Sequence, residues 1–269
     1  GADEMFGGYR KHLACVMADR YRRLPAPALN VVGATVDRLP VRFAGRGIRY
    51  SRWAKRFLTF SQLPEEAAFR RSYSLYDPTE LAGLLSPELA PDVDDVMGQH
   101  VELYCDSYFD DHVNRMCLAD TRHFLPGLNL TYVDRASMAA STEVRVPFVD
   151  PVVFRAAFSF TGDQKVKGRR GKIALKEAAE TWLPKQIVHR PKASFSAPLR
   201  AWVSNELRPL VDEAVLDGEL VNSGFLRRDA IRALVDEDRQ GREDRSKQLW
   251  QLLTMDLWYR QARSAGVAL

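Results

Sequence analysis

Apolar residues recur every three or four positions along most of this chain of 269 residues. That spacing places them on one face of an α-helix. It predicts helices over residues 9–24, 78–85, 93–125, 130–142, 151–160, 171–183 and 246–262, with one or two more between residues 42 and 62. Only residues 143–149 alternate as an extended segment does. We therefore predict a mainly-α fold, formed by a single unit over residues 1–269.

Aspartates and prolines mark the ends of several predicted helices. Asp77 and Asp150 each precede a proline, which is typical of an N-cap followed by the first helical turn. Pro25 and Pro126 follow long apolar patterns, and a proline inside a helix removes a backbone hydrogen bond. We expect the first helix to end before Pro25 and the long one to stop at Pro126.

The composition is that of an ordinary soluble protein, with 46% hydrophobic and 28% charged residues. No apolar run approaches the length needed to cross a bilayer, so we expect no membrane association. The three cysteines, Cys15, Cys105 and Cys117, are few and odd in number. Such a set favours a reducing compartment, and the cytoplasm is the expected location.

Positive charge is concentrated in one segment. Residues 163–200 hold ten Lys or Arg and three acidic residues, a net charge of +7 in a chain whose total is +4. The glycine-spaced stretch from Lys165 to Lys172 leads into a predicted helix, where Lys172 and free backbone N–H groups could bind a phosphate. A solvated basic loop is the alternative. The modest total charge does not indicate a nucleic-acid partner.

Two adjacent carboxylates, Asp3 and Glu4, lie in a turn flanked by glycines at Gly1, Gly7 and Gly8. Glycine permits a tight backbone path close to a ligand. Mg²⁺ uses one or two carboxylates when it holds a substrate's phosphates. The alternative is an ordinary helix start, with both acids in the first turn.

Other candidate sites are not supported. The separations of His100, Cys105, His112 and Cys117 do not place all four on one helical face, which argues against zinc. There is no Gly-x-Ser-x-Gly elbow and no Walker-type loop.

The neighbouring opposite charges Asp134-Arg135 and Glu143-x-Arg145 are predicted to form partly buried structural ion pairs.

Several segments, in order, resemble motifs of glutamine-dependent asparagine synthetases. They are Gly-Ala-Asp-Glu-Met-Phe-Gly-Gly-Tyr at Gly1, Val-Asp-Arg-Ala-Ser-Met-Ala at Val133, Glu-Val-Arg-Val-Pro-Phe-Val-Asp at Glu143, Gly-Lys-Ile-Ala-Leu-Lys-Glu-Ala at Gly171, Leu-Pro-Lys-Gln-Ile-Val-His-Arg-Pro-Lys-Ala-Ser-Phe at Leu183, and the Trp-rich final helix. The resemblance covers essentially the whole chain. It implies the C-terminal helical portion of an α/β ATP-pyrophosphatase-type synthetase domain, similar to the adenine nucleotide α-hydrolase fold.

The resemblance also implies a reaction. In that family, ATP and Mg²⁺ activate the side-chain carboxylate of aspartate as an adenylate, and glutamine-derived ammonia then displaces AMP to give asparagine. By resemblance, Asp3 with Glu4 would bind Mg²⁺. Lys172 would stabilise charge on the triphosphate, and Arg190 and Lys192 would contact the same phosphates.

The chain departs from the family's pattern in two respects. The Ser-Gly-Gly-x-Asp-Ser pyrophosphate loop and the N-terminal glutaminase domain are absent from it. We therefore expect a C-terminal piece of a longer enzyme, with the missing glutaminase and nucleotide-binding segments as its partners. Alone it is expected to be inactive and to expose apolar surface, which allows homo-oligomers or aggregation.

Two alternatives remain open at this stage. β-Lactam synthetases and peptide-cyclising amide ligases reuse the same domain with other substrates, and a fold-level resemblance does not separate them. A non-catalytic helical binding module is the third interpretation, favoured by the missing loop. The presence of Asp3 and Lys172 argues against it, since a scaffold would not need them.

Overall fold

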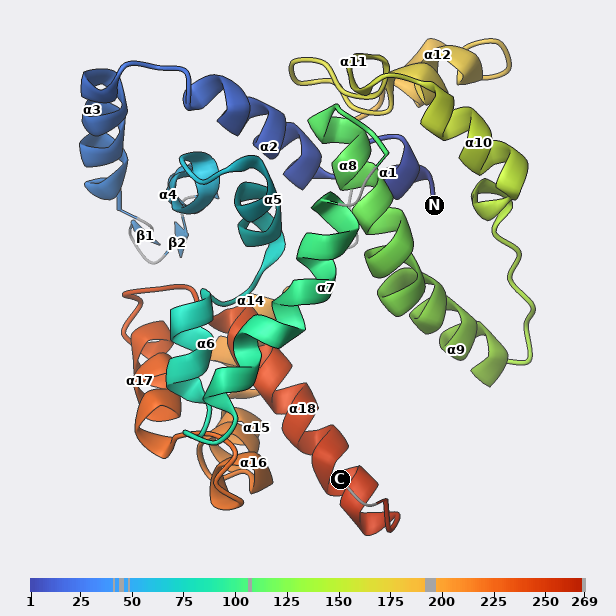
Figure 1. Ribbon diagram of the computed structural model, residues 1–269. Helices are drawn as coiled ribbons and strands as arrows, with labels where there is room; N and C mark the ends of the chain where they lie inside the picture. Colours follow the sequence, from blue (N-terminus) through green and yellow to red (C-terminus); the bar gives the residue numbers. More distant parts are fainter. Residues whose placement is uncertain (41, 44–45, 48, 106–107, 192–196, 268–269) are drawn as a thin grey trace. The chain divides into compact units, whose positions relative to one another are not determined.

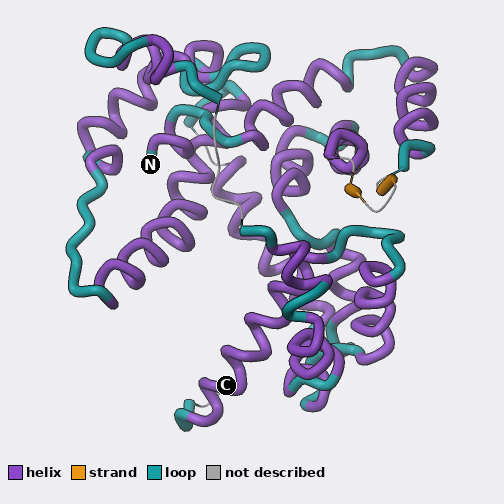
Figure 2. The backbone as a smooth tube through the Cα atoms, turned by 180° about the vertical axis from the view of Figure 1, so that it is seen from behind, coloured by secondary structure: helices purple, strands orange, loops and turns teal. Residues whose placement is uncertain are grey.

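The computed structural model confirms the mainly-α prediction (Figure 1). It describes residues 1–269 except 41, 44–45, 48, 106–107, 192–196 and 268–269. Nearly all of the described backbone is helix or loop, and the strands are the short antiparallel pair β1 (Arg42–Phe43) and β2 (Arg46–Gly47) (Figure 2). Among the described residues, no helix is both long and apolar enough to span a membrane.

Contacts divide the chain into two compact units. Unit 1 comprises Gly1–Pro40, Ile48–Tyr73 and Gly98–Lys192, and unit 2 comprises the remaining segments. The prediction of a single unit over residues 1–269 stays a prediction, because two compact groups of contacts can belong to one domain. Every residue of the candidate site described below belongs to unit 1.

Unit 1 contains most of the N-terminal and central helices. Their bounds are α1 (Ala2–Met5), α2 (Arg10–Tyr21), α3 (Ala26–Asp37), α4 (Arg49–Ser61), α5 (Glu65–Tyr73), α8 (His112–Ala119), the π-helix η2 (Asp120–Leu130), α9 (Thr131–Ala139), the short 3₁₀ turn η3 (Pro147–Val149), α10 (Pro151–Ser159), α11 (Gly162–Lys165), α12 (Ile173–Ala179) and α13 (Lys185–Val188). Helix α7 (Val93–Cys105) contributes its residues from Gly98 onward.

Unit 2 contains shorter helices and the final long one. Their bounds are α6 (Pro78–Leu84), η1 (Ala90–Asp92), α14 (Leu199–Ser204), α15 (Arg208–Val211), η4 (Asp212–Leu216), α16 (Glu219–Asn222), α17 (Arg228–Arg239) and α18 (Ser246–Ser264). Its core is mostly aliphatic and includes the almost completely buried Ile231, Val235 and Leu253 of α17 and α18.

The capping predictions at the two Asp-Pro pairs are confirmed. The Asp77 carboxylate accepts a hydrogen bond from Thr79 N at the start of α6, and Glu80 completes a capping box. Asp150 likewise accepts from Val152 N at the start of α10. Each cap satisfies a helix N–H group that would otherwise lack a partner.

Two helix predictions and the one extended segment need correction. The predicted helix over residues 93–125 is broken, because α7 ends at Cys105 and Asp111 caps a new helix, α8. The segment from residue 42 begins with the β1–β2 pair, and its helix starts only at Arg49. Residues 143–146 are irregular and pair with no described strand, and η3 follows them. Helix α3, which starts directly after Pro25, was not predicted.

Pro126 does not stop the long helix. It lies inside η2, so that α8, η2 and α9 form one continuous helical run (Figure 1). A π-helix bonds residue i to residue i+5, and its wider turn accommodates the proline ring that would clash in an α-helix. The Thr131 hydroxyl donates to the carbonyl of Pro126 at 2.8 Å. This run brings Asp120 and Asn129 to the candidate site.

Unit 1 has two buried clusters. The larger one packs α2, α5 and α8 together around the fully buried Phe69, Met116 and Cys117. The smaller one joins α1 to α10 through Met5, Phe6 and Ala157. Large apolar side chains also stay exposed on unit 1, including Val31 at 66%, Val152 at 64% and Trp182 at 81%. The expectation that the chain exposes apolar surface and associates stays a prediction.

Candidate functional site

The first residues of the chain contact the basic loop that precedes α12. The backbone N–H of Lys172 donates to the carbonyl of Phe6 at 3.1 Å. A Cβ at Gly171 would lie 2.5 Å from the carbonyl oxygen of Gly7, so only glycine permits this approach. Two sequence motifs that are more than 160 residues apart thus form one site.

Lys172 has a left-handed backbone, with φ of 54° and ψ of 39°, directly before the first residue of α12. For a residue other than glycine, this conformation costs roughly 1–2 kcal/mol. The hydrogen bond to Phe6 holds it in place. Backbone strain of this kind often occurs where a side chain must be held in one direction, so it supports a functional role for Lys172.

The side chain of Lys172 points to Asp3. Its Nζ lies 2.7 Å from Oδ1 of Asp3, and the two side chains are 27% and 24% exposed. Both side chains therefore reach solvent, although Oδ1 of Asp3 is itself buried. The pair offers a carboxylate that can ligate a metal and a cation that can bind a phosphate, side by side.

Gly8 leaves room for this pair. A Cβ at Gly8 would lie 2.0 Å from Asp3 Oδ1, 2.2 Å from Lys172 Cε and 2.9 Å from the backbone Cα of Asp3. We expect Gly8→Ala to lower the free energy of unfolding by about 1–3 kcal/mol, as overpacking does. The measurement is urea denaturation of this chain.

Gly33→Ala is the matched control. Gly33 lies inside α3, and a Cβ there would meet no atom within 4 Å. Alanine favours helix by about 1 kcal/mol over glycine, so this variant should be as stable as the parent or more stable. Equal stability of the Gly8→Ala variant and the parent would contradict the tight packing around Asp3 and Lys172.

Glu4 has a different environment from Asp3. Its side chain is 2% exposed, and Oε1 accepts hydrogen bonds from the Tyr9 hydroxyl at 2.5 Å and from Asn129 Nδ2 at 2.6 Å. Burial, followed by the hydrogen bond to Glu4, raises the pKa of Tyr9 far above its usual value. The phenol therefore stays protonated and can donate to Glu4. These contacts fix α1 against η2.

A second buried polar group lies on α2 and η2. His12 Nε2 and Lys11 Nζ contact the two oxygens of Asp120 at 2.8 Å and 2.5 Å. His12 is fully buried and Asp120 is 3% exposed. Burial alone would raise the pKa of Asp120, but the hydrogen bond from His12 and the charge of Lys11 outweigh it and hold the pKa below its ordinary value.

The ammonium of Lys11 also lies against aromatic rings. Its Nζ is 4.3 Å from the ring centroid of Tyr73 and 4.6 Å from that of Phe124. Cation–π attraction of this kind strengthens when the cation is shielded from water. Lys11 is thus held in place by Asp120 and by the rings, which orients the start of α2 directly after the Asp3 turn.

Lys165 is part of the basic loop but does not face solvent. Its side chain is fully buried, with Nζ 4.1 Å from the ring centroid of Phe158. Burial lowers the pKa of Lys165. The exposed cations of the loop are Lys167, Arg169 and Arg170, so the loop has a buried anchor and a charged outer side.

A pocket of about 470 Å³ opens beside this loop. Its lining residues come from the end of α10, from α11, from the loop and from α12: Phe160, Asp163, Gln164, Lys167, Arg170, Ile173, Ala174 and Glu177. Asp3 and Lys172 are not among them. The pocket and the Asp3–Lys172 pair are therefore distinct features of the same loop.

The other predicted site residues lie as follows. Arg190 is exposed, shortly after α13. Lys192 lies outside the described residues. Glu143 and Arg145 do form an ion pair at 3.0 Å, but their side chains are 72% and 86% exposed, so the prediction of partial burial is wrong for this pair. The segment that holds the pair is irregular and exposed to solvent, so neither side chain is buried.

Sequence reasoning missed Lys11, His12, Asp120 and Asn129. Lys11 and His12 follow the first motif directly, but no spacing connects them to residues more than 100 positions later. The signal that could have indicated Asn129 was the stretch around Pro126. A proline and a glycine within an otherwise helical pattern can mark a π-turn, and such turns are frequent at functional sites.

Comparison with known proteins gives one consistent family. A sequence profile described as Asparagine synthase matches residues 1–260. A Mycobacterium tuberculosis protein, provisionally named asparagine synthetase [glutamine-hydrolyzing], is 31% identical over 267 residues, which cover 96% of this chain and 38% of the relative. Asparagine synthetase [glutamine-hydrolyzing] 1 of Bacillus subtilis is 25% identical and covers similar shares, 96% and 39%.

The chain thus spans about two fifths of the length of these curated relatives. No solved structure matches it.

Proposed function

Since the chain belongs to the asparagine synthase family, we propose that it forms part of an ATP-dependent amide ligase that makes asparagine. In this proposal the longer protein adenylates the side-chain carboxylate of aspartate and releases pyrophosphate. Ammonia derived from glutamine then replaces AMP. The chain supplies one side of the adenylation site, and the remaining length found in the relatives supplies the nucleotide-binding and glutaminase parts.

The observation that carries the proposal is the Asp3–Lys172 pair. Lys172 Nζ lies 2.7 Å from Oδ1 of Asp3, and about a quarter of each side chain remains exposed although Oδ1 itself is buried. Mg²⁺ takes oxygen ligands, typically one or two carboxylates together with substrate phosphates, and Asp3 fits that donor set. Bound Mg²⁺ would neutralise phosphate charge. Lys172 would hold a positive charge where negative charge develops as pyrophosphate leaves.

Glu4, Arg190 and Lys192 have lesser roles in the proposal. Glu4 was predicted as a second metal ligand. Its hydrogen bonds to Tyr9 and Asn129 favour a positioning role, in which it orients the Asp3 turn. Arg190, exposed after α13, is proposed to contact the phosphates of ATP together with Lys192. The three free cysteines agree with a reducing compartment, and we propose the cytoplasm.

The test is pyrophosphate release by the full-length product of the gene. We expect release with ATP, Mg²⁺, ammonia and aspartate, and at least tenfold less when aspartate is omitted. This chain alone, assayed in parallel, should give no release. Release that depends on another carboxylic acid and not on aspartate would favour the β-lactam-forming or peptide-cyclising alternatives. Absence of both release and ATP binding in the full-length protein would favour a non-catalytic helical module.

A further inference from the structure

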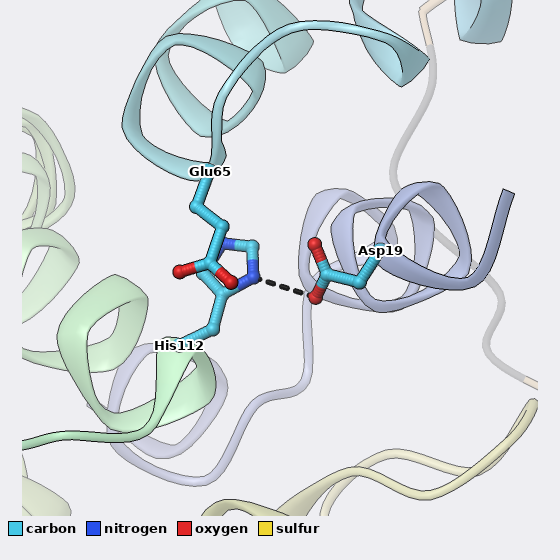
Figure 3. A group of neighbouring side chains, drawn as sticks. All are labelled: Asp19, Glu65 and His112. Carbon is cyan, nitrogen blue, oxygen red and sulfur yellow. Dashed lines mark hydrogen bonds and ion pairs between the residues drawn. The ribbon is translucent and has the colours of Figure 1, made fainter. Parts of the chain in front are cut away.

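Three helices of unit 1 direct side chains to one point on the side of α2. Asp19 comes from the last turn of α2, Glu65 is the first residue of α5, and His112 is the first residue of α8 (Figure 3). Each residue offers one ligand atom, and these atoms all lie within 4.8 Å of one another. The group contains an imidazole and two carboxylates, so it is more than a patch of acidic residues.

The imidazole of His112 is held in place for this role. Its side chain is 7% exposed, and Nδ1 lies 2.7 Å from Asp19 Oδ2. The ring packs edge-on against Tyr104, with the centroids 6.0 Å apart. The other nitrogen, Nε2, is buried and has no hydrogen-bond partner within the described part of the chain. Among the described residues, the polar contacts of the His112 ring are therefore made through Nδ1, to Asp19.

Asp19 and Glu65 complete the donor set. One oxygen of Asp19 pairs with Arg22, whose guanidinium also donates to the carbonyl of Leu63 at 2.9 Å. The other oxygen faces His112. Glu65 is exposed, so its carboxylate can move without disturbing the core. When the imidazole is neutral, the charges of the Asp19 and Glu65 carboxylates and of the Arg22 guanidinium sum to −1 at this site.

The distances suit a small tetrahedral ion after a modest adjustment. Ligands at the 2.0–2.1 Å that is typical of zinc lie about 3.3 Å apart in a tetrahedron. His112 and Asp19 would have to separate by roughly 0.6 Å to admit the ion, and Glu65 would have to approach by up to roughly 1.5 Å. When the metal binds Nδ1, the ring proton that now faces Asp19 would move to Nε2, so that the imidazole stays neutral.

We propose that Asp19, Glu65 and His112 bind a Zn²⁺ ion that links α2, α5 and α8. An imidazole with two carboxylates favours zinc over Mg²⁺ or Ca²⁺, which prefer all-oxygen sites. Three protein ligands leave a fourth position for water. The site is separate from the Asp3–Lys172 pair and does not depend on the proposed ligase activity. Its consequence is structural, because an ion that binds only the folded chain stabilises it.

The experiment titrates this chain with Co²⁺, a coloured substitute for Zn²⁺, and then displaces it with Zn²⁺. We expect one equivalent of tetrahedral Co²⁺, with visible absorption that Zn²⁺ abolishes, and a higher Tm in the presence of Zn²⁺. His112→Gln and Glu65→Gln should each weaken binding by about tenfold or more. Glu65 is exposed, so its variant keeps the test valid if the His112 variant fails to fold.

His189→Gln is the matched control. It removes another imidazole that pairs with a carboxylate, at 2.6 Å from Glu180, on the exposed part of unit 1. Its Co²⁺ spectrum and affinity should equal those of the parent. The proposal is overturned if the chain binds neither ion below millimolar concentration. It is also overturned if Glu65→Gln leaves the affinity unchanged, or if His189→Gln weakens it as much as the site variants do.

Discussion

Lys172→Ala in the full-length protein is expected to slow aspartate-dependent pyrophosphate release by about 10²–10³-fold. This is the typical effect of removing one fixed group that stabilises charge in a transition state. The Lys172 backbone is held by Phe6, and its Nζ lies beside Asp3, so the position of the charge is fixed. The loss should be in kcat more than in the affinity for ATP, because the charge grows during the reaction.

The measurement is steady-state pyrophosphate release with saturating aspartate, together with ATP binding by the same variants. Lys176→Ala is the matched control, since Lys176 lies one turn further along α12 and the substitution removes the same charge. It should stay within a few-fold of the parent. Comparable losses in both variants would indicate a general effect of positive charge, and the assigned role of Lys172 would then fail.

Asp120→Ala is expected to lower the free energy of unfolding of this chain by about 3–5 kcal/mol. That is the usual cost of removing one partner from a buried charged group and leaving the other behind. Here the ammonium of Lys11 and the ring of His12 would lose their carboxylate, and water does not replace it readily at a residue that is 3% exposed. The measurement is the urea midpoint, with Asp134→Ala on exposed α9 as the control.

The same carboxylate gives a pH dependence. Its pKa is lower in the folded chain than in the unfolded chain. The stability it contributes is therefore fully present above the unfolded pKa and is lost as the pH falls through the folded pKa. Asp120→Asn should flatten this acid limb, which urea midpoints between pH 7 and acid conditions will measure. An unchanged acid limb in Asp120→Asn would show that other groups govern acid stability.

The sequence by itself determined the family, the mainly-α character and several of the longer helices, among them α2, α10 and α18. The ordered motifs from Gly1 to the final helix identified the family correctly, because the order and identity of these residues can be read directly from the sequence. Asp77 and Asp150 were recognisable as caps, since a cap acts within three residues of itself. The mainly helical character followed from the spacing of apolar residues, which is also local.

The tertiary structure decided which of these local features meet. The backbone hydrogen bond between Lys172 and Phe6, and the space that Gly8 leaves for the side chains of Asp3 and Lys172, depend on two segments far apart in the sequence. The group of Asp19, Glu65 and His112 arises in the same way, from three helices whose spacing in the sequence gave no metal signature. Pro126 lies inside η2, against its local preference to end a helix, and the same run carries Asp120 and Asn129 to their buried partners. The local sequence determines which conformation each segment favours. The free energy of long-range packing then determines which of these local preferences are kept in the folded chain.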